Sequence, residues 1–281
     1  MKKIFLLLLF CGVLGSHADF VYRLPDTSFL TTGDLDGDGR SDLVLVDGLN
    51  ATVRVGYQLS ATNLTWAAAR PLGLAEVTDI NCGSVKSNAY DSIIATAPTL
   101  NRLNMYNAGS ANTILSPEAI YMNGTGPYSL ATLDIGGAGN TAQDDIVVIT
   151  TLNGSSPHKM EYIRSQGTSF STLGKVGIGS AWWHLNAIDY ELGIEGLAVV
   201  DALSPGFLRI YDFSSGSYSN KASVSTFGLT QPHYVSFLLP SGEAHFVLWE
   251  KGSSTIRTTT LKNAGAIYSF SSLSDYVLPD P

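Results

Sequence analysis

The sequence predicts an all-β fold, a β-propeller of about five four-stranded blades. Short apolar runs that suit β-strands recur along the chain and begin at residues 43, 93, 146, 197 and 246. The steps between them are 50, 53, 51 and 49 residues, and a period near fifty is typical of propellers and other repeat arrays. Between these runs, short apolar segments alternate with turn residues, and no amphipathic helix of normal length interrupts them.

Each of these apolar runs is preceded by a segment of the same kind, which we expect to form the neighbouring strand. In the first four repeats this segment carries an aspartate at one equivalent point, and the fifth repeat has lost it. The four residues are Asp34, Asp79, Asp134 and Asp189. Runs such as Thr52–Tyr57 and Phe207–Tyr211 alternate as middle strands with one buried face do. Residues 20–24 resemble the strand that ends a repeat, and we expect them to complete the last blade, which would remove exposed edges.

The first repeat contains a dense aspartate loop that runs directly into the apolar strand Leu43–Val46. Its carboxylates stand at relative positions one, three, five and nine, and they belong to Asp34, Asp36, Asp38 and Asp42. Gly37 and Gly39 allow the backbone to curl tightly enough for these oxygens to converge. A shell made only of oxygen suits a hard cation, so the loop predicts a Ca²⁺ site, with the carbonyl of Arg40 as a further ligand.

This spacing, followed at once by a strand, resembles the FG-GAP or VCBS repeat, the calcium-loop blade of integrin-α-like β-propellers. An EF-hand differs because it needs a glutamate at position twelve and a following helix, whereas position twelve here is Leu45. The resemblance implies that Asp34, Asp36, Asp38 and Asp42 bind Ca²⁺ through their side chains and Arg40 through its carbonyl. It covers about one blade at full strength, and it also implies recognition of a protein or glycan on one face of the propeller.

The corresponding loops of the other repeats have weaker metal-binding chemistry. In the second repeat Lys86 lies between Asp79 and Asp91 and opposes a cation, so we interpret it as a plain turn. The third keeps acids at both ends, Asp134 and the pair Asp144–Asp145, without acids between them, and would bind calcium weakly. The fourth and fifth repeats predict structural loops, because the acidic residues Asp189, Glu191, Glu195 and Glu243 stand there with little glycine.

The N-terminus predicts export of the protein. Lys2 and Lys3 precede an apolar run at residues 4–10, and small residues end at Ala18, which is the pattern of a secretory signal peptide. We therefore expect a signal peptide at residues 1–18, a propeller at residues 19–281, and a secreted, extracellular or periplasmic location. The run is too short to span a bilayer, so no membrane span is expected.

Composition excludes some classes of partner. The formal charge of −8 includes Lys2 and Lys3, so the mature chain would carry −10, which argues against nucleic acid and against anionic membranes. One cysteine, Cys82, remains after cleavage, so no internal disulfide can form. We expect a monomer that is stabilised by its core and by the bound metal.

Catalytic motifs are weak in this sequence. No zinc-binding H-E-x-x-H pattern and no G-x-S-x-G elbow is present. Trp182 and Trp183 stand just before the first strand expected in the fourth repeat, where aromatic rings either stack on sugars or pack between blades. The function predicted is a secreted, calcium-binding module for adhesion or for binding a protein or glycan. The alternative is a carbohydrate-active hydrolase or lyase on a propeller scaffold, for which Asp144–Asp145 offer paired carboxylates.

Overall fold

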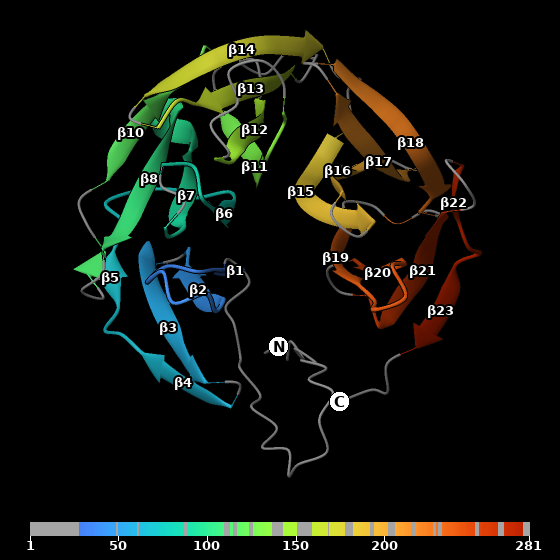
Figure 1. The fold of residues 1–281 in the computed structure, drawn as a ribbon, viewed down its shortest axis with the longest axis horizontal. Coiled ribbons are helices and arrows are strands. Elements are labelled where there is room, and N and C mark those ends of the chain that lie inside the picture. The colour runs from blue at the N-terminus through green and yellow to red at the C-terminus, as the bar shows by residue number, and fades with distance from the viewer. Residues whose placement is uncertain are drawn as a thin grey trace.

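The chain folds into five antiparallel sheets arranged in a ring in the computed structural model, which confirms the predicted five-bladed propeller (Figure 1). The structure describes residues 28–277 except for 49, 61, 87–88, 110–112, 115–116, 124–125, 137–142, 151–158, 168, 178–181, 192–193, 202–205, 215–216, 227–228, 230–231, 251–252 and 264–266. The expected signal peptide and the strand expected at residues 20–24 lie outside the described residues. Within the described part of the chain, no helix has the length and apolar character needed to cross a membrane.

Each blade is a sheet with a four-strand path, and three of the five sheets carry an extra short strand. Blade 1 contains β1 (Ser28–Gly33), β2 (Asp42–Asp47), β3 (Thr52–Ser60), β4 (Asn63–Trp66) and β5 (Arg70–Pro71). Blade 2 contains β6 (Ile80–Gly83), β7 (Ser92–Ala97), the short 3₁₀ helix Pro98–Leu100, β8 (Arg102–Gly109), β9 (Thr113–Ile114) and β10 (Glu118–Tyr121). Blade 3 contains β11 (Pro127–Leu133), β12 (Asp145–Thr150), β13 (Lys159–Ser165) and β14 (Phe170–Gly177).

Blade 4 contains β15 (Trp182–Glu191), β16 (Ile194–Asp201), β17 (Phe207–Ser214) and β18 (Ser217–Ser225). Blade 5 contains β19 (His233–Leu238), β20 (Ala244–Trp249), β21 (Thr255–Asn263), β22 (Tyr268–Phe270) and β23 (Ser274–Val277). The outer position of blade 5 is shared by β22 and β23, which both pair with β21. C-terminal strands therefore supply the fourth strand of this blade.

The five apolar runs of the sequence become the second strand of each blade, namely β2, β7, β12, β16 and β20. Every residue of β7 and of β12 is buried, because blades 2 and 3 pack against a neighbour on both faces. In β2 and β20 buried and half-buried residues alternate instead. Blades 1 and 5 therefore bury one sheet face more deeply than the other.

Four apolar cores hold the row of blades together in the described part of the chain. Val44, Val46 and Val55 of blade 1 pack with Ile80 and Ile93 of blade 2. Comparable clusters join blade 2 to blade 3, blade 3 to blade 4, and blade 4 to blade 5. Side chains of this kind contribute about 1.5–3 kcal/mol each when fully buried, so these interfaces supply most of the stability of the ring.

Because neighbouring strands within a blade are antiparallel, successive connections lie on opposite faces of the ring. The connection after the first strand of every blade lies on one face of the ring, which we call the first-turn face. The first strands begin on the opposite face, the strand-start face. Residues 34–41 follow β1 and so lie on the first-turn face, whereas Trp182 and His233 open β15 and β19 on the strand-start face.

Candidate functional site

The aspartate loop joins β1 to β2, and glycines set its curvature. Gly37 and Gly39 have φ angles of +77° and +81°, which is the left-handed region that residues with a Cβ adopt at a cost. A Cβ on Gly37 would clash with the carbonyl oxygen of Ala89 in blade 2, whereas one on Gly39 would meet no atom within 4 Å. Gly37 is therefore required both by its φ angle and by its close approach to the neighbouring blade.

The Asp34 carboxylate organises the backbone of the loop. It accepts hydrogen bonds from the N–H groups of Gly37 at 2.8 Å, Asp38 at 3.1 Å and Gly39 at 2.8 Å. At the end of the loop, the buried Asp42 accepts from Leu35 N–H at 3.0 Å and from Gln58 N–H at 2.9 Å. Both ends of the loop are thus fixed by carboxylates that receive backbone donors.

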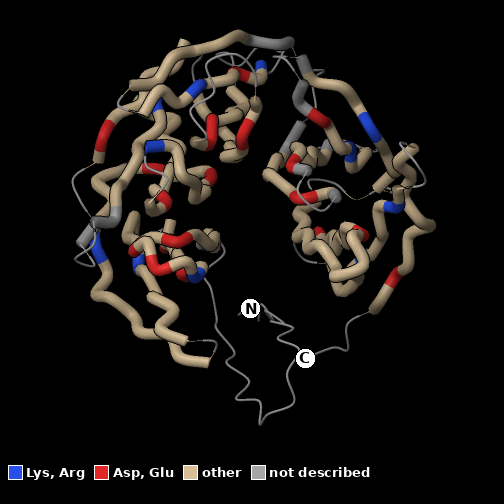
Figure 2. Tube along the Cα trace, viewed as in Figure 1, with Lys and Arg blue, Asp and Glu red and all other residues tan. Residues whose placement is uncertain are grey.

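Three of the four predicted carboxylates converge. One oxygen each from Asp34, Asp36 and Asp42 lies within 4.8 Å of the others. Burial raises the pKa of Asp42, hydrogen bonds from Gln58 and Leu35 lower it, and the nearby charges of Asp36 and Asp38 raise it again. Figure 2 shows acidic segments, in red, on the inner part of blade 1. An oxygen-only set of this kind fits a hard divalent cation, which these three residues would hold.

Asp38, the fourth predicted carboxylate, is not part of this group. The carboxylate of Asp38 forms an ion pair with the guanidinium of Arg40 and accepts the Arg40 N–H at 2.9 Å. Arg40 Nε also donates to the carbonyl of Gln58 at 2.8 Å. The structure therefore brings Asp34, Asp36 and Asp42 together, and it places Asp38 against Arg40 at the rim of the loop.

Asp91 of blade 2 clasps this loop from the neighbouring blade. Its Oδ2 accepts the Asp34 N–H at 2.8 Å, and its own N–H donates to the Asp34 carbonyl at 2.6 Å. Burial raises the pKa of Asp91, and the charges of Asp144, Asp34 and Asp42 raise it further. The sequence alone suggested that Asp91 belonged to a plain turn, because it gives no sign of this partner 57 residues away.

The same contact recurs around the ring. Asp144 of blade 3 accepts the Ser84 N–H of blade 2 at 2.8 Å, and Glu195 of blade 4 accepts the Asp134 N–H of blade 3 at 3.2 Å. We call these two acids, together with Asp91, the interblade latches: Asp91, Asp144 and Glu195. Each reaches from the start of a second strand to the end of the preceding blade's first strand. Asp144, predicted in a weak calcium loop, thus joins neighbouring blades, as do Asp91 and Glu195, which were predicted in a plain turn and a structural loop.

The predicted equivalence of Asp79 with Asp34 is wrong. Gly33 pairs with Asp42 and Gly83 pairs with Ser92, so the residue of blade 2 that corresponds to Asp34 is Ser84. Asp79 instead precedes β6 on the strand-start face. It is buried, and its Oδ2 accepts from Ser129 Oγ at 2.6 Å and Leu130 N–H at 3.0 Å in blade 3. The prediction failed because Asp79 precedes its strand, β6, whereas Asp34 follows its strand, β1. The sequence does not show on which side of such a short strand an aspartate lies.

The loop of the third repeat lies beside Arg164, whose positive charge would repel a bound metal ion. Arg164 Nη2 donates to the Gly136 carbonyl at 2.6 Å, and Arg164 Nε lies 3.8 Å from Asp145 Oδ2. Asp145 Oδ1 accepts the Ser165 N–H at 2.9 Å. Residues 137–142 of this loop lie outside the described residues. The positive charge of Arg164 makes this loop a poorer cation site than residues 34–42.

A second group of polar and aromatic side chains surrounds the ring axis on the strand-start face. Nδ1 of His184 lies 3.9 Å from Asp79 Oδ2, and the His184 ring is 5.4 Å from that of Tyr234 and 6.1 Å from that of His233. Burial raises the pKa of Asp79 to about 7 and lowers the pKa of His184 to about 4. Asn81 Nδ2 of blade 2 donates to Asn186 Oδ1 of blade 4 at 3.1 Å, across the axis.

The backbone of Trp182 and Trp183 opens β15 beside this group, and their side chains lie outside the described residues. Sequence reasoning missed the cluster of Asp79, His184, His233 and Tyr234, which comes from blades 2, 4 and 5. The one available signal was His184 itself, which directly follows the two tryptophans. The other members are scattered along the chain, and only the ring topology brings them together.

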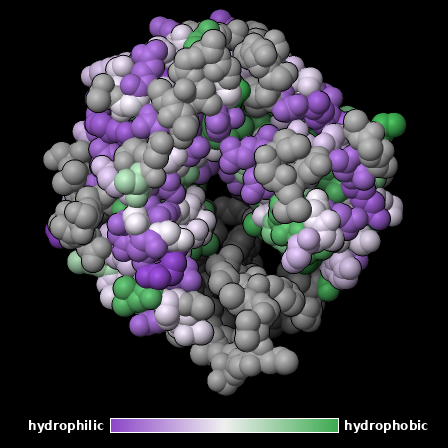
Figure 3. All heavy atoms as spheres, in the orientation of Figure 1, coloured by the Kyte–Doolittle hydropathy of each residue, from purple (hydrophilic) through white to green (hydrophobic). Residues whose placement is uncertain are grey.

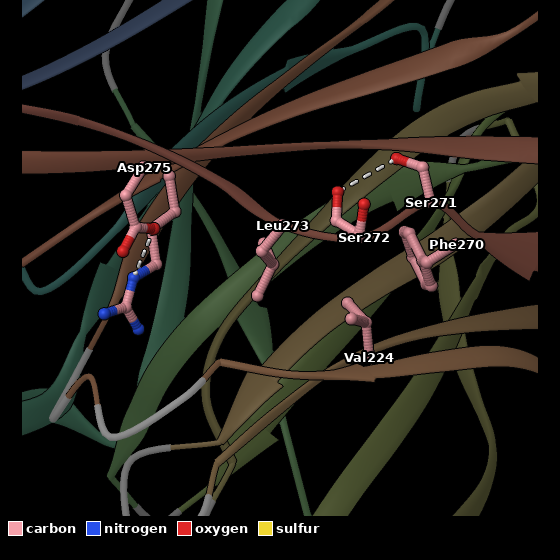
Figure 4. A pocket seen from close by; sticks show the side chains of 7 residues that line it. Val224, Phe270, Ser271, Ser272, Leu273 and Asp275 are labelled. Atoms are coloured by element: carbon pink, nitrogen blue, oxygen red, sulfur yellow. Dashed lines mark hydrogen bonds and ion pairs between the residues drawn. The ribbon is translucent and has the colours of Figure 1, made fainter.

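A depression of ≈ 600 Å³ lies between the outer strands of blades 4 and 5 (Figure 4). Val224, Phe270 and Leu273 form its apolar side. At one end Arg257 Nε lies 3.0 Å from Asp275 Oδ1, and Arg257 Nη1 donates to the Thr226 carbonyl at 2.6 Å. Among the described residues that line the depression, Asp275 is the one acid.

Comparison with known proteins supports the fold and goes no further. No family model and no curated protein matches the sequence. Among solved structures, the crystal structure of a protein from Lactobacillus plantarum, a structural genomics target, is similar with a TM-score of 0.54 and 14% sequence identity. The match covers 85% of this chain and 69% of that one. At this identity the likeness shows a shared fold alone, and folds of this kind carry many functions.

Proposed function

We propose that this protein is a secreted, calcium-binding β-propeller that acts as an adhesion or binding module for a protein or glycan. The observation that carries the proposal is the convergence of Asp34, Asp36 and Asp42 within 4.8 Å in a loop curled by Gly37 and Gly39. This agrees with the resemblance of the loop to FG-GAP or VCBS repeats. Calcium would offset the mutual repulsion of the carboxylates and stiffen blade 1, and so would act as a structural ion.

The acids considered for catalysis form structural hydrogen bonds, and this favours binding over catalysis. Asp144 and Asp145, the pair considered for sugar hydrolysis, each accept a backbone N–H, from Ser84 and from Ser165 respectively. Asp79, whose pKa burial raises to about 7, is bonded to Ser129 and Leu130. These carboxylates support the fold, and a partner would be bound by the strand-start face around the half-buried His184 and His233.

Isothermal titration calorimetry of the mature protein tests the metal part of the proposal. We expect one Ca²⁺ per chain with a dissociation constant on the order of 10⁻⁴ M, as in extracellular modules. Asp36→Ala should abolish the heat of binding. The control is Glu76→Ala, which removes an exposed acid between β5 and β6 and should leave the heat of binding unchanged. Equal binding by the two variants would place the ion elsewhere.

Glycan-array and protein-binding screens in calcium test the second part. Saturable binding that is lost when His184 is replaced by alanine supports a module that uses the strand-start face. Release of free sugar from a polysaccharide by the purified protein would instead favour the hydrolase or lyase alternative.

A further inference from the structure

A buried tyrosine of blade 1 carries a hydroxyl that the fold itself does not use. Tyr57 belongs to β3, is 3% exposed, and packs in the core between blades 1 and 2. Among the described residues, no group makes a hydrogen bond with its hydroxyl. A buried hydroxyl without a partner costs free energy that a water molecule or an ion can recover. The position of this hydroxyl therefore matters.

The strand register sets Tyr57 beside the end of the aspartate loop. Leu43 of β2 pairs with Gly56 of β3, so the next step along the two strands places Asp42 opposite Tyr57. Residues directly opposite in an antiparallel pair lie on the same sheet face, with Cβ atoms about 4.5–5.5 Å apart. Both side chains are buried. The hydrogen bond from Gln58 N–H to Asp42 Oδ1, at 2.9 Å, holds the two strands together at this point.

The Tyr57 hydroxyl is within electrostatic reach of two predicted ligands. Burial raises the pKa of Tyr57, and the charges of Asp42 and Asp36 raise it further. On its other side the loop meets solvent, because residues 37–41 are exposed. Figure 3 shows hydrophilic residues, in purple, over much of the visible surface of blade 1. Tyr57 thus approaches the carboxylates from the interior, whereas ions and water reach them from outside.

The equivalent pair of residues in blades 2 and 3 is satisfied within the chain. In blade 2, Ser92 lies opposite Asn107, and Ser92 Oγ donates to Asn107 Oδ1 at 2.8 Å. In blade 3 the register places Asp145 opposite Arg164, and Asp145 Oδ2 lies 3.8 Å from Arg164 Nε. In the part of blade 1 that the structure describes, the Tyr57 hydroxyl has no such partner. Blade 1 is thus the blade of these three whose pair is left to bind something else.

Arg164 also shows where a side chain at this position can reach. By the strand registers, Gly136 of the third loop corresponds to Asp36 of the first. Arg164 Nη2 donates to the Gly136 carbonyl at 2.6 Å, so its guanidinium lies against the loop and brings a positive charge there. Tyr57 stands at the same position in blade 1 and offers a neutral oxygen instead. Such an oxygen can join the shell of a cation without repelling it.

We infer that the Tyr57 hydroxyl holds a water molecule on the Ca²⁺ of the aspartate loop and thereby positions the ion against Asp42. The inference rests on the calcium site of the proposed function and adds a residue to it. Ca²⁺ takes about six to eight oxygen ligands, some of them water, and three converging carboxylates leave room for such a water. The water donates a hydrogen bond to Tyr57 Oη, and the hydroxyl proton is directed at a carboxylate. Tyr57 is therefore a positioning residue that acts through water.

Tyr57→Phe tests the inference, because it removes the hydroxyl and keeps the ring. Calorimetric titration with Ca²⁺ should show a dissociation constant raised about five- to tenfold, which corresponds to the loss of one hydrogen bond. Thermal unfolding in chelator should give a melting temperature equal to that of wild type or above it, since the substitution removes a buried hydroxyl without a partner. In calcium the melting temperature should fall below that of wild type.

Tyr106→Phe is the matched control. Tyr106 is 1% exposed in the same core, and its hydroxyl donates to the Leu72 carbonyl at 2.5 Å. Its removal should lower the melting temperature equally in calcium and in chelator and leave the dissociation constant of Ca²⁺ unchanged. A tyrosine with a merely structural role gives this pattern. The same pattern in Tyr57→Phe would overturn the inference.

The outcomes separate this inference from the calcium site itself. If wild type and Tyr57→Phe bind Ca²⁺ equally, the calcium site stands and the role of Tyr57 is wrong. No binding by wild type overturns both. A crystal structure of the calcium-loaded protein tests the geometry: we expect Tyr57 Oη within hydrogen-bond distance of a water bound to the ion. A hydroxyl that contacts no ligand of the ion would contradict the inference.

Discussion

Asp91 and Asp34 hold each other through two hydrogen bonds that cross a blade boundary: Asp91 Oδ2 accepts the Asp34 N–H at 2.8 Å, and Asp91 N–H donates to the Asp34 carbonyl at 2.6 Å. The Asp34 side chain meanwhile belongs to the three-carboxylate group with Asp36 and Asp42. One residue thus serves the candidate metal loop with its side chain and the interface between blades 1 and 2 with its backbone.

Removal of the Asp91 carboxylate should therefore loosen both features. Asp91→Ala leaves the Asp34 N–H without its acceptor and should cost about 1–3 kcal/mol of the free energy of unfolding. Asp91→Asn keeps one acceptor oxygen and should cost less. Urea denaturation measures the loss, and calcium titration of the same variants should show weaker binding than wild type. Asp212→Asn, which alters a half-buried ion pair with Lys221 within blade 4, is the control; a loss as large in this variant would contradict the account.

Two glycines of the same loop should differ in their tolerance of alanine. Gly37 and Gly39 both have positive φ, so alanine strains the backbone at either position by about 1 kcal/mol. Only at Gly37 does the new Cβ also meet a carbonyl oxygen, that of Ala89. Gly37→Ala should thus be clearly more destabilising than Gly39→Ala in urea denaturation. The reverse order would mean that blade 2 does not approach the loop in the folded protein.

Asp79 and His184 should give opposing pH dependences that single substitutions separate. The pKa of Asp79 rises from 3.8 to about 7 on folding, so the stability it contributes is fully present below pH 3.8 and is lost as pH rises through 7. The pKa of His184 falls from 6.5 to about 4, so its contribution is present above pH 6.5 and is lost as pH falls through 4.

Between pH 4 and 6.5 these two effects oppose each other in the wild type. Asp79→Asn should leave the His184 effect, and its stability should rise with pH across that window more steeply than that of wild type. His184→Gln should leave the Asp79 effect, and its stability should fall as pH rises. Denaturation at several pH values checks the two slopes. The same slope in both variants would show that neither group titrates as its burial implies.

The sequence was sufficient for the fold because the repeating signal is a property of the core. The runs beginning at Leu43, Ile93 and Ile146 became second strands of three blades, since a strand buried on one or both faces must be apolar. The period of about fifty residues then gave the number of blades. Local chemistry likewise predicted the aspartate loop, and Asp34, Asp36 and Asp42 converge as the spacing suggested.

The parts that could not be predicted depend on distant pairs. Asp91 and Glu195 appeared to belong to degenerate or structural loops, yet each accepts a backbone N–H about sixty residues earlier in the chain. The ion pair that diverts Asp38 toward Arg40 depends on the side-chain conformation of one arginine. Neither the partner of a carboxylate nor its direction is encoded in residue type or spacing, so only the folded ring reveals them.

The central claim is best tested by thermal unfolding of residues 19–281 in calcium, in magnesium and in chelator. Calcium should raise the melting temperature and magnesium should not, because Mg²⁺ demands near-ideal octahedral geometry and gives up its bound waters reluctantly. Asp36→Ala should lower the melting temperature in calcium and have little effect in chelator, and Glu76→Ala should match wild type throughout. No shift with calcium, or an equal loss in Asp36→Ala with and without the ion, would contradict the calcium site at Asp34–Asp42.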